Sequence, residues 1–200
     1  MVLTVHLTFS MGWIGAVVAY LALGVSAVKG DTLTIRAAWI GMDLTGWYAV
    51  VPLALGSLVT GLIIALGTPW GLFRSYWVLI SFALTVFAVV ILLLHMPTVS
   101  SQALAARVAD AAVLRSLGGD LFHPSVGLLV LLVIAVLNIY KPRGLTPYGR
   151  KKQLEAGVKP NPESTEGSAR WVKMFALALS GLVLVFALLH HVLGGGTRHH

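Results

Sequence analysis

Long apolar runs dominate this chain, and short segments in which charged, proline and glycine residues gather separate them. A membrane-spanning helix needs roughly 20 mostly apolar residues. Five runs are long enough, namely residues 2–28, 47–66, 76–95, 121–140 and 171–193. The pattern therefore predicts an all-α, polytopic membrane bundle of about five transmembrane helices, with short interfacial helices between them.

The segments between these runs are predicted to stay outside the lipid. Residues 29–46 carry Asp31, Arg36 and Asp43, so we expect them at the membrane interface. Pro97 is expected to end the third span, because proline has no N–H to continue the helix. The alanine-rich residues 100–117 are predicted to form a short surface helix. Residues 141–170, rich in proline, glycine and charge, are predicted to form a cytoplasmic loop.

Residues 1–193 are predicted to form a single transmembrane domain, which ends at a glycine-rich segment. Residues 194–200, with the sequence GGGTRHH, resemble a linker and the remnant of an affinity tag. Arg198, His199 and His200 are therefore not expected to contribute to function.

The basic residues predict how the bundle is oriented. Eight of the fourteen Lys and Arg lie between residues 141 and 173, and Arg74 falls on the same side. Apart from Arg198 in the predicted tag remnant, the others are Lys29, Arg36, Arg107 and Arg115, and these four fall on the opposite side. Because cytoplasmic loops carry an excess of Lys and Arg, we expect the N-terminus in the cytoplasm and the C-terminus outside a bacterial plasma membrane.

The composition of the chain indicates which partners it can have and which residues could bind a metal. The chain is 58% hydrophobic and 10% charged, so lipid must solvate much of its surface. In a soluble protein, a net charge of +7 would suggest that the protein binds nucleic acid. In this chain the basic residues gather in one loop between apolar runs, so they indicate the orientation in the membrane. The predicted partner is therefore the lipid bilayer, and no nucleic acid is expected. The chain has no cysteine, so a metal would need His, Met, carboxylate or main-chain ligands.

Three histidines are predicted to lie at one depth near the outer surface. His95 lies 21 residues after Arg74, His123 lies 18 before Lys141, and His190 lies 17 after Lys173. At 1.5 Å per residue, each is about 25 to 32 Å from the cytoplasmic face. His191 adjoins His190, but neighbours on a helix differ by about 100°, so only one of the two is expected to face the interior.

Imidazoles from different helices at matching depth are typical of a haem or metal site between helices. We expect haem b bound by His95 with His190 or His191, and with His123 as an alternative ligand. Copper is the alternative cofactor, with candidate ligands His95, Met96, His123 and His190. Asp43 and Asp120 lie nearest to span ends and are candidates to orient the imidazoles.

The histidines could also have an ordinary role at helix ends, without binding a cofactor. An imidazole at a helix end is hydrogen-bonded by interfacial water, and His123 precedes Pro124, a residue typical of helix starts. His6 lies near the cytoplasmic end of the first span, where it either binds a second haem with Met11 or Met174 or forms a hydrogen bond with a neighbouring helix.

Several strings resemble known membrane proteins. HL at 6–7 followed by WIG at 13–15 resembles the first helix of copper-resistance D-like membrane domains, and of a related family of small bacterial integral membrane proteins of unknown function. The strings LGTPWGLFR (66–74), YWV (76–78), LHMP (94–97) and YKPRGLTPYG (140–149) resemble that second family in particular. The similarity covers about residues 2–152. It implies a compact helical bundle in the plasma membrane and points to copper or haem, without an established activity.

The functional prediction is a haem-b or copper protein that transfers electrons or senses haem through a site near the outer leaflet, with a redox partner that the sequence does not identify. The alternative is a non-catalytic membrane subunit, or a small-solute transport component, without a metal. Lipid or quinone binding between helices is a third interpretation. No nucleotide-binding or hydrolase motif occurs, and enzyme activity is left undecided. Small residues on the spans are compatible with a homodimer.

Overall fold

The computed structural model describes residues 1–68, 71–142, 144–157 and 180–181, and over these ranges it contains helices and no strand. The elements are α1 (Val2–Lys29), α2 (Thr32–Thr45), the π-helical segment η1 (Gly46–Val50), α3 (Val51–Gly67), α4 (Tyr76–Val108), α5 (Ala111–Leu117), α6 (Phe122–Tyr140) and α7 (Pro147–Glu155). Four stretches of the described chain are long and apolar enough to span a membrane, namely Val2–Lys29, Thr32–Gly67, Tyr76–Val108 and Ala111–Tyr140. The protein is therefore a multi-pass, all-α membrane bundle. The predicted fifth span at 171–193 lies outside the described residues.

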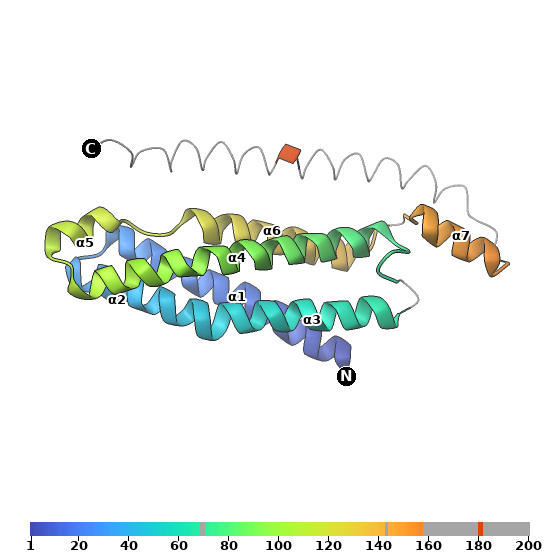
Figure 1. The fold of residues 1–200 in the computed structure, drawn as a ribbon, viewed down its shortest axis with the longest axis horizontal. Coiled ribbons are helices and arrows are strands. Elements are labelled where there is room, and N and C mark those ends of the chain that lie inside the picture. The colour runs from blue at the N-terminus through green and yellow to red at the C-terminus, as the bar shows by residue number, and fades with distance from the viewer. Residues whose placement is uncertain (69–70, 143, 158–179, 182–200) are drawn as a thin grey trace.

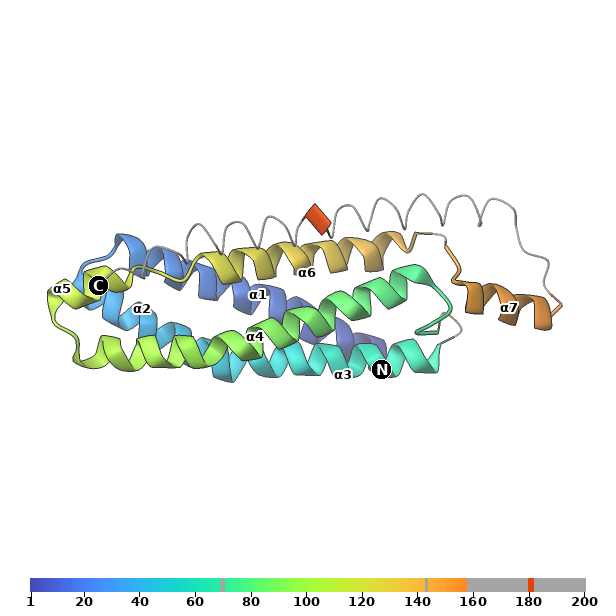
Figure 2. The same cartoon turned by 45° about the horizontal axis from the view of Figure 1, so that its top comes forward.

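The four long helical stretches run alternately up and down beside one another (Figure 1). Helix α1 packs against α2, α3 and α6, and α4 packs against α2, α3 and α6. The N-terminus and α7 lie at one end of the bundle, and α5 lies at the opposite end, as the turned view in Figure 2 also shows. The turn between α5 and α6 is consequently far from the predicted cytoplasmic face.

The segment predicted at the interface, residues 29–46, is largely helical and continues into the second span. Gly46 has helical backbone angles, so α2, η1 and α3 form one continuous helical stretch. Apolar residues of α2 recur at helical spacing and are buried, namely Ile35, Ala38, Trp39 and Met42. The helix that contains the second span therefore begins at Thr32, well before the predicted start of the span at residue 47, because the buried face of α2 packs on α1 and α4 and stabilises the longer helix.

The prediction that Pro97 ends the third span was wrong, because α4 continues to Val108 with Pro97 inside it. Beyond the proline, Val99, Ala103 and Ala106 are buried, and this part of α4 packs against α2. Packing of this face outweighs the single hydrogen bond that proline removes. The predicted surface helix at 100–117 is therefore divided between the end of α4 and the short α5.

The predicted cytoplasmic loop contains a helix that the sequence argument missed. Thr146 caps α7 by accepting a hydrogen bond from the Gly149 N–H, and Pro147 occupies the first helical position, where proline is favoured. The Thr146 hydroxyl also donates to the carbonyl oxygen of Phe73, and Ser75 pairs with Leu145. These bonds attach α7 to the loop that precedes α4.

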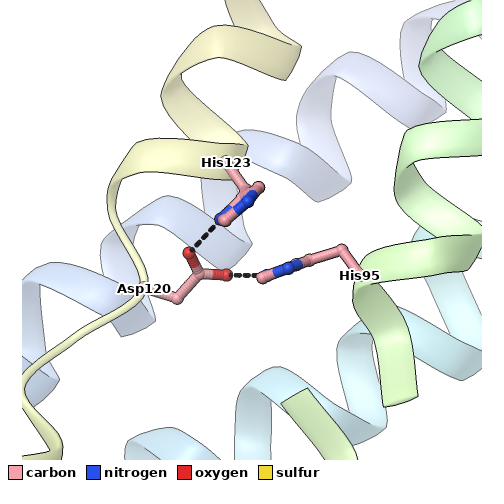
Figure 3. A group of neighbouring side chains, drawn as sticks. All are labelled: His95, Asp120 and His123. Carbon is pink, nitrogen blue, oxygen red and sulfur yellow. Dashed lines mark hydrogen bonds and ion pairs between the residues drawn. The ribbon is translucent and has the colours of Figure 1, made fainter. Parts of the chain in front are cut away.

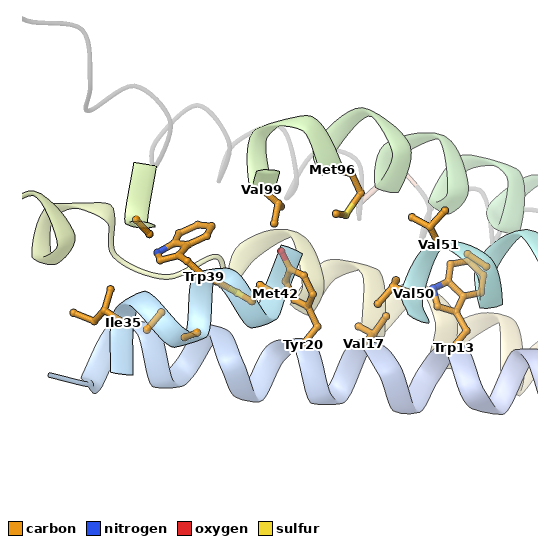
Figure 4. Close-up of a cluster of buried hydrophobic side chains, with 14 of the residues drawn as sticks. Trp13, Val17, Tyr20, Ile35, Trp39, Met42, Val50, Val51, Met96 and Val99 are labelled. Atoms are coloured by element: carbon orange, nitrogen blue, oxygen red, sulfur yellow. The ribbon is translucent and has the colours of Figure 1, made fainter. Parts of the chain in front are cut away.

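The main hydrophobic core fills the space between α1, α2, α3 and α4 (Figure 4). Trp13, Val17 and Tyr20 contribute from one face of α1, where residues three and four apart lie together. Met42 and Met96 meet them from α2 and α4 and are almost completely buried. This core holds α1 and α4 in register on either side of the polar residues described next.

Candidate metal site and its cavity

Three polar side chains meet where α4 passes the start of α6, and Figure 3 shows both imidazole rings directed at one carboxylate. His95 Nε2 lies 2.7 Å from Asp120 Oδ2, and His123 Nδ1 lies 3.3 Å from Asp120 Oδ1. The candidate ligand atoms of His95, Asp120 and His123 all lie within 4.8 Å of one another. Residues from two separate helices and the turn between α5 and α6 therefore form one cluster.

Hydrogen bonding assigns a role to each atom of this cluster. An ionised carboxylate only accepts hydrogen bonds, so each imidazole donates an N–H to Asp120. The hydroxyl of Tyr20 donates a third bond to Asp120 Oδ2, at 3.0 Å. The two imidazole rings also stack, with centroids 3.7 Å apart and planes 22° apart. Asp120 thus joins α1, α4 and α6 at one point.

The depth of the cluster agrees with the spacing argument from the sequence. His95 lies 19 residues after Tyr76, where α4 begins, which is about 28 Å along the helix axis. Helix α6 begins at Phe122, so His123 is in its first turn. A hydrocarbon core is about 30 Å thick, so both rings lie about one such thickness from the end of the bundle at which α4 begins.

Two glycines let the Asp120 turn approach α1 closely. A Cβ atom on Gly24 would lie 2.7 Å from the carbonyl oxygen of Asp120, and a Cβ atom on Gly119 would clash with the carbonyl oxygen of Gly24. Gly118 has a φ of 62°, in the region that favours glycine. The GGD sequence at 118–120 therefore places the carboxylate against α1, and Asp120 lies beside the α6 N-terminus, where negative charge is favoured.

Side chains of α2 hold the same turn from the other direction. Trp39 Nε1 donates to the carbonyl oxygen of Gly118 at 3.2 Å, and Arg36 donates to the carbonyl oxygen of Ala109 at 2.8 Å. These two bonds fix the chain just before and just after α5. They limit how far the turn that carries Asp120 can move.

Asp43, the other acid predicted to orient an imidazole, has a different partner. Its Oδ1 accepts a 2.7 Å bond from the Ser100 hydroxyl, which in turn accepts a bond from Trp47 Nε1. This chain of bonds joins α2, η1 and α4. Of the two acids, only Asp120 contacts a histidine among the described residues.

The cluster lies at one end of an apolar cavity of about 330 Å³ between α1, η1, α4 and α6. Side-chain exposure is 8% for Asp120, 17% for His95 and 29% for His123. The carboxylate is consequently shielded, while the imidazoles remain partly accessible. Most other residues that line the cavity are apolar.

The remaining predicted site residues are placed differently. Met96 lines the cavity but packs in the core, where a Cβ on Gly46 would lie 2.8 Å from its sulfur. His6 Nδ1 is 3.0 Å from the Thr60 hydroxyl of α3, which is the hydrogen-bonding role predicted for it. Met11 is exposed on α1. His190, His191 and Met174 lie outside the described residues.

Comparison of the chain with protein-family models, with curated proteins and with solved structures gave no match. Assignment to a family therefore stays a prediction from the strings quoted above, and the site is interpreted from its geometry.

Tyr20 is the residue of the site that the sequence argument missed. A signal for it existed, because Trp13, Val17 and Tyr20 follow one another at helical spacing and mark a single face of the first span. A tyrosine on a buried face needs a hydrogen-bond acceptor, and an acid at the same depth is the natural candidate.

Proposed function

We propose that this chain is an integral membrane protein that binds a transition-metal ion, with copper as the favoured ion, through His95, Asp120 and His123. The observation that carries the proposal is the convergence of two imidazole nitrogens and a carboxylate, from two helices and a turn, at 2.7 and 3.3 Å. The resemblance to copper-resistance D-like domains points to the same ion. The protein would use this ion for metal handling or electron transfer at the membrane surface.

The donor set fits this chemistry. Imidazole and carboxylate bind Zn²⁺ and Cu²⁺, and Cu²⁺ binds such sites most strongly among the first-row divalent ions. Metal bonds of about 2.0–2.1 Å in a tetrahedral arrangement separate the ligand atoms by roughly 3.3 Å. The observed nitrogen–oxygen separations are 2.7 and 3.3 Å, and all three candidate ligand atoms lie within 4.8 Å of one another, so an ion that replaces the N–H protons would draw the side chains closer together.

Haem b is supported less well by the described residues. A six-coordinate haem iron holds its axial imidazoles on opposite faces of the macrocycle, whereas the rings of His95 and His123 stack directly at 3.7 Å. The pairing of His95 with His190 or His191 stays a prediction. Its test is a Soret band after expression with added haem, and loss of that band in His190→Ala.

The competing proposal is structural. Three hydrogen bonds to Asp120 would join α1, α4 and α6 in a non-catalytic subunit without any metal. The two proposals differ in one measurable property, the affinity for metal ions. They agree that removal of Asp120 destabilises the bundle.

The experiment is a titration of the purified, chelator-treated protein with Cu²⁺ and Zn²⁺, with bound metal measured after equilibrium dialysis. The background carries His199→Ala and His200→Ala, so that the terminal imidazoles bind no ion. We expect one ion per chain, and an affinity at least about 100-fold lower in His95→Ala and His123→Ala. His6→Ala is the matched control, because His6 is also a membrane histidine and lies outside the cluster.

Two results would refute metal binding at this cluster. One is a metal content no higher than that of the buffer blank. The other is unchanged affinity in His95→Ala and His123→Ala with both variants folded, as judged by circular dichroism and gel filtration.

We further propose that α7 and the N-terminus face the cytoplasm of a bacterial cell and that the cluster faces outward. The basic residues Arg150, Lys151 and Lys152 of α7 support this orientation. Because the chain has no cysteine, a single engineered cysteine reports the side directly. A membrane-impermeant maleimide applied to intact cells should label Val113→Cys and should leave Lys151→Cys unlabelled, and the reverse pattern would invert the topology.

A further inference from the structure

The cavity beside the cluster is distinctive because its two ends differ in chemistry. Its walls come from α1, η1, α4 and α6, and Trp13, Leu84 and Val130 are among the apolar side chains that form them. The polar groups gather at the end formed by Tyr20 and the cluster. At about 330 Å³ the volume lies at the lower end of the range for small-molecule sites, roughly 300–1,000 Å³.

One residue that lines the cavity also lies on the outer surface of the bundle. This residue is Phe87, which is 46% exposed on the outside of α4, within a stretch apolar enough to span the membrane. A molecule that passes Phe87 therefore comes from the bilayer and must itself be mostly apolar. It would reach the polar end without crossing the core.

The polar end offers hydrogen-bond acceptors. A carboxylate has about four acceptor positions. Tyr20 and the two imidazoles occupy three of those on Asp120, so about one position remains for a ligand. The Tyr20 hydroxyl already donates to Asp120. Asp120 would repel a ligand carboxylate, and a ligand carbonyl has no hydrogen to donate to its remaining acceptor position.

From this geometry we propose that the cavity binds an apolar molecule with a hydroxyl head, of the isoprenoid alcohol or quinol class, whose hydroxyl donates to the acceptors at the Asp120 end. The proposal goes beyond metal binding and does not depend on it, because the acceptors are those of the metal-free cluster. It assigns a ligand class to a cavity that the metal proposal leaves unused.

The test uses matched ligands on the unaltered full chain in nanodiscs, with EDTA present throughout so that the result is independent of any metal. Radiolabelled farnesol is the probe, and farnesyl methyl ether, farnesoate, a short-chain quinol and its quinone compete with it. We expect the methyl ether to bind about tenfold more weakly than farnesol, because it has lost the hydrogen that the site accepts. The quinol should likewise compete better than the quinone, and the relative strength of farnesol and quinol identifies the source.

A pair of glycine substitutions tests the location. Gly127 lines the cavity on α6, and a Cβ built on it meets no atom within 4 Å, so Gly127→Leu should occupy the cavity and weaken farnesol binding at least about tenfold. Gly15 of α1 has equally open surroundings and does not line the cavity, so Gly15→Leu should bind farnesol within about twofold of the unaltered chain.

Several outcomes would overturn the proposal. Equal binding of farnesol and its methyl ether would remove the role of the hydroxyl, and tighter binding of farnesoate would show that the polar end attracts anions. Farnesol binding that Gly127→Leu leaves unchanged would place the ligand elsewhere. Because EDTA is present, none of these results bears on metal affinity, which the dialysis experiment measures separately.

Discussion

Removing the Asp120 carboxylate is the sharpest test of how the bundle is held together. Asp120→Ala leaves the hydroxyl of Tyr20 and the N–H groups of His95 and His123 without their acceptor. Hydrogen bonds to a charged group contribute about 1.5–3 kcal/mol each. His95 and His123 are 17% and 29% exposed, so water replaces part of what the rings lose, and the sum falls below three full bonds. We expect the free energy of unfolding to drop by about 3–5 kcal/mol, the range for breaking a buried pair.

Asp43→Ala provides the comparison, because Asp43 lies in the same part of the bundle and accepts one hydrogen bond, from Ser100. We expect it to lower the free energy of unfolding by about 1.5–3 kcal/mol, the range for a single bond to a charged group. Both variants are unfolded reversibly by SDS in mixed micelles and followed by far-ultraviolet circular dichroism. If Asp120→Ala is no more destabilising than Asp43→Ala, the carboxylate does not join the three helices as described.

Three further predictions concern the parts that position the site. Gly119→Ala should lower the free energy of unfolding by about 1–3 kcal/mol, measured in the same titration, because its Cβ clashes with the carbonyl oxygen of Gly24. Arg36→Ala should lower it by about 1–2 kcal/mol and increase amide exchange at the end of α4, since the guanidinium no longer donates to Ala109. A backbone N–H bond at the start of α2 holds the pKa of Asp31 below its usual value of 3.8, so this cap stabilises α2 above that value and is lost as the pH falls through the lowered pKa. Amide exchange three residues after Asp31 should rise over that range.

Each of these has a control in the chain. Gly15→Ala adds a methyl group in open surroundings and should not destabilise the bundle, so equal losses at Gly15 and Gly119 would contradict the close approach. Arg115→Ala removes an arginine of α5 that belongs to none of the bonds described here, and it should leave exchange at the end of α4 unchanged. Asp31→Asn still accepts the capping bond without titrating, so its exchange should not respond to acid.

The spans were predictable because lipid imposes a requirement that each segment meets alone. A helix that crosses must be apolar over roughly 20 residues, whatever it packs against. Residues 2–28 and 121–140 accordingly match α1 and α6 to within one residue at each end. The start of the third span at Tyr76 also agrees.

Helix continuity beyond the lipid could not be read in the same way. Pro97 and the charges of residues 29–46 are local signals for helix ends, and both were overruled by packing between α2 and α4. The buried positions involved, such as Met42 and Val99, lie far apart in the chain. Residues that are distant in the sequence stabilise these helix ends, so the neighbouring residues alone do not predict where the helices end.

For the site, residue spacing and helical rise by themselves determined that His95 and His123 share a depth, because distance along a helix axis depends only on residue number. Which way each ring faces, and which acid meets it, was decided by tertiary structure. The close contact of Gly24 with Gly119 brings Asp120 to Tyr20 and both imidazoles, while Asp43 turns to Ser100. Rotation about the helix axis and the path of a turn are set by packing between helices, so only the folded bundle could reveal the cluster and the cavity beside it.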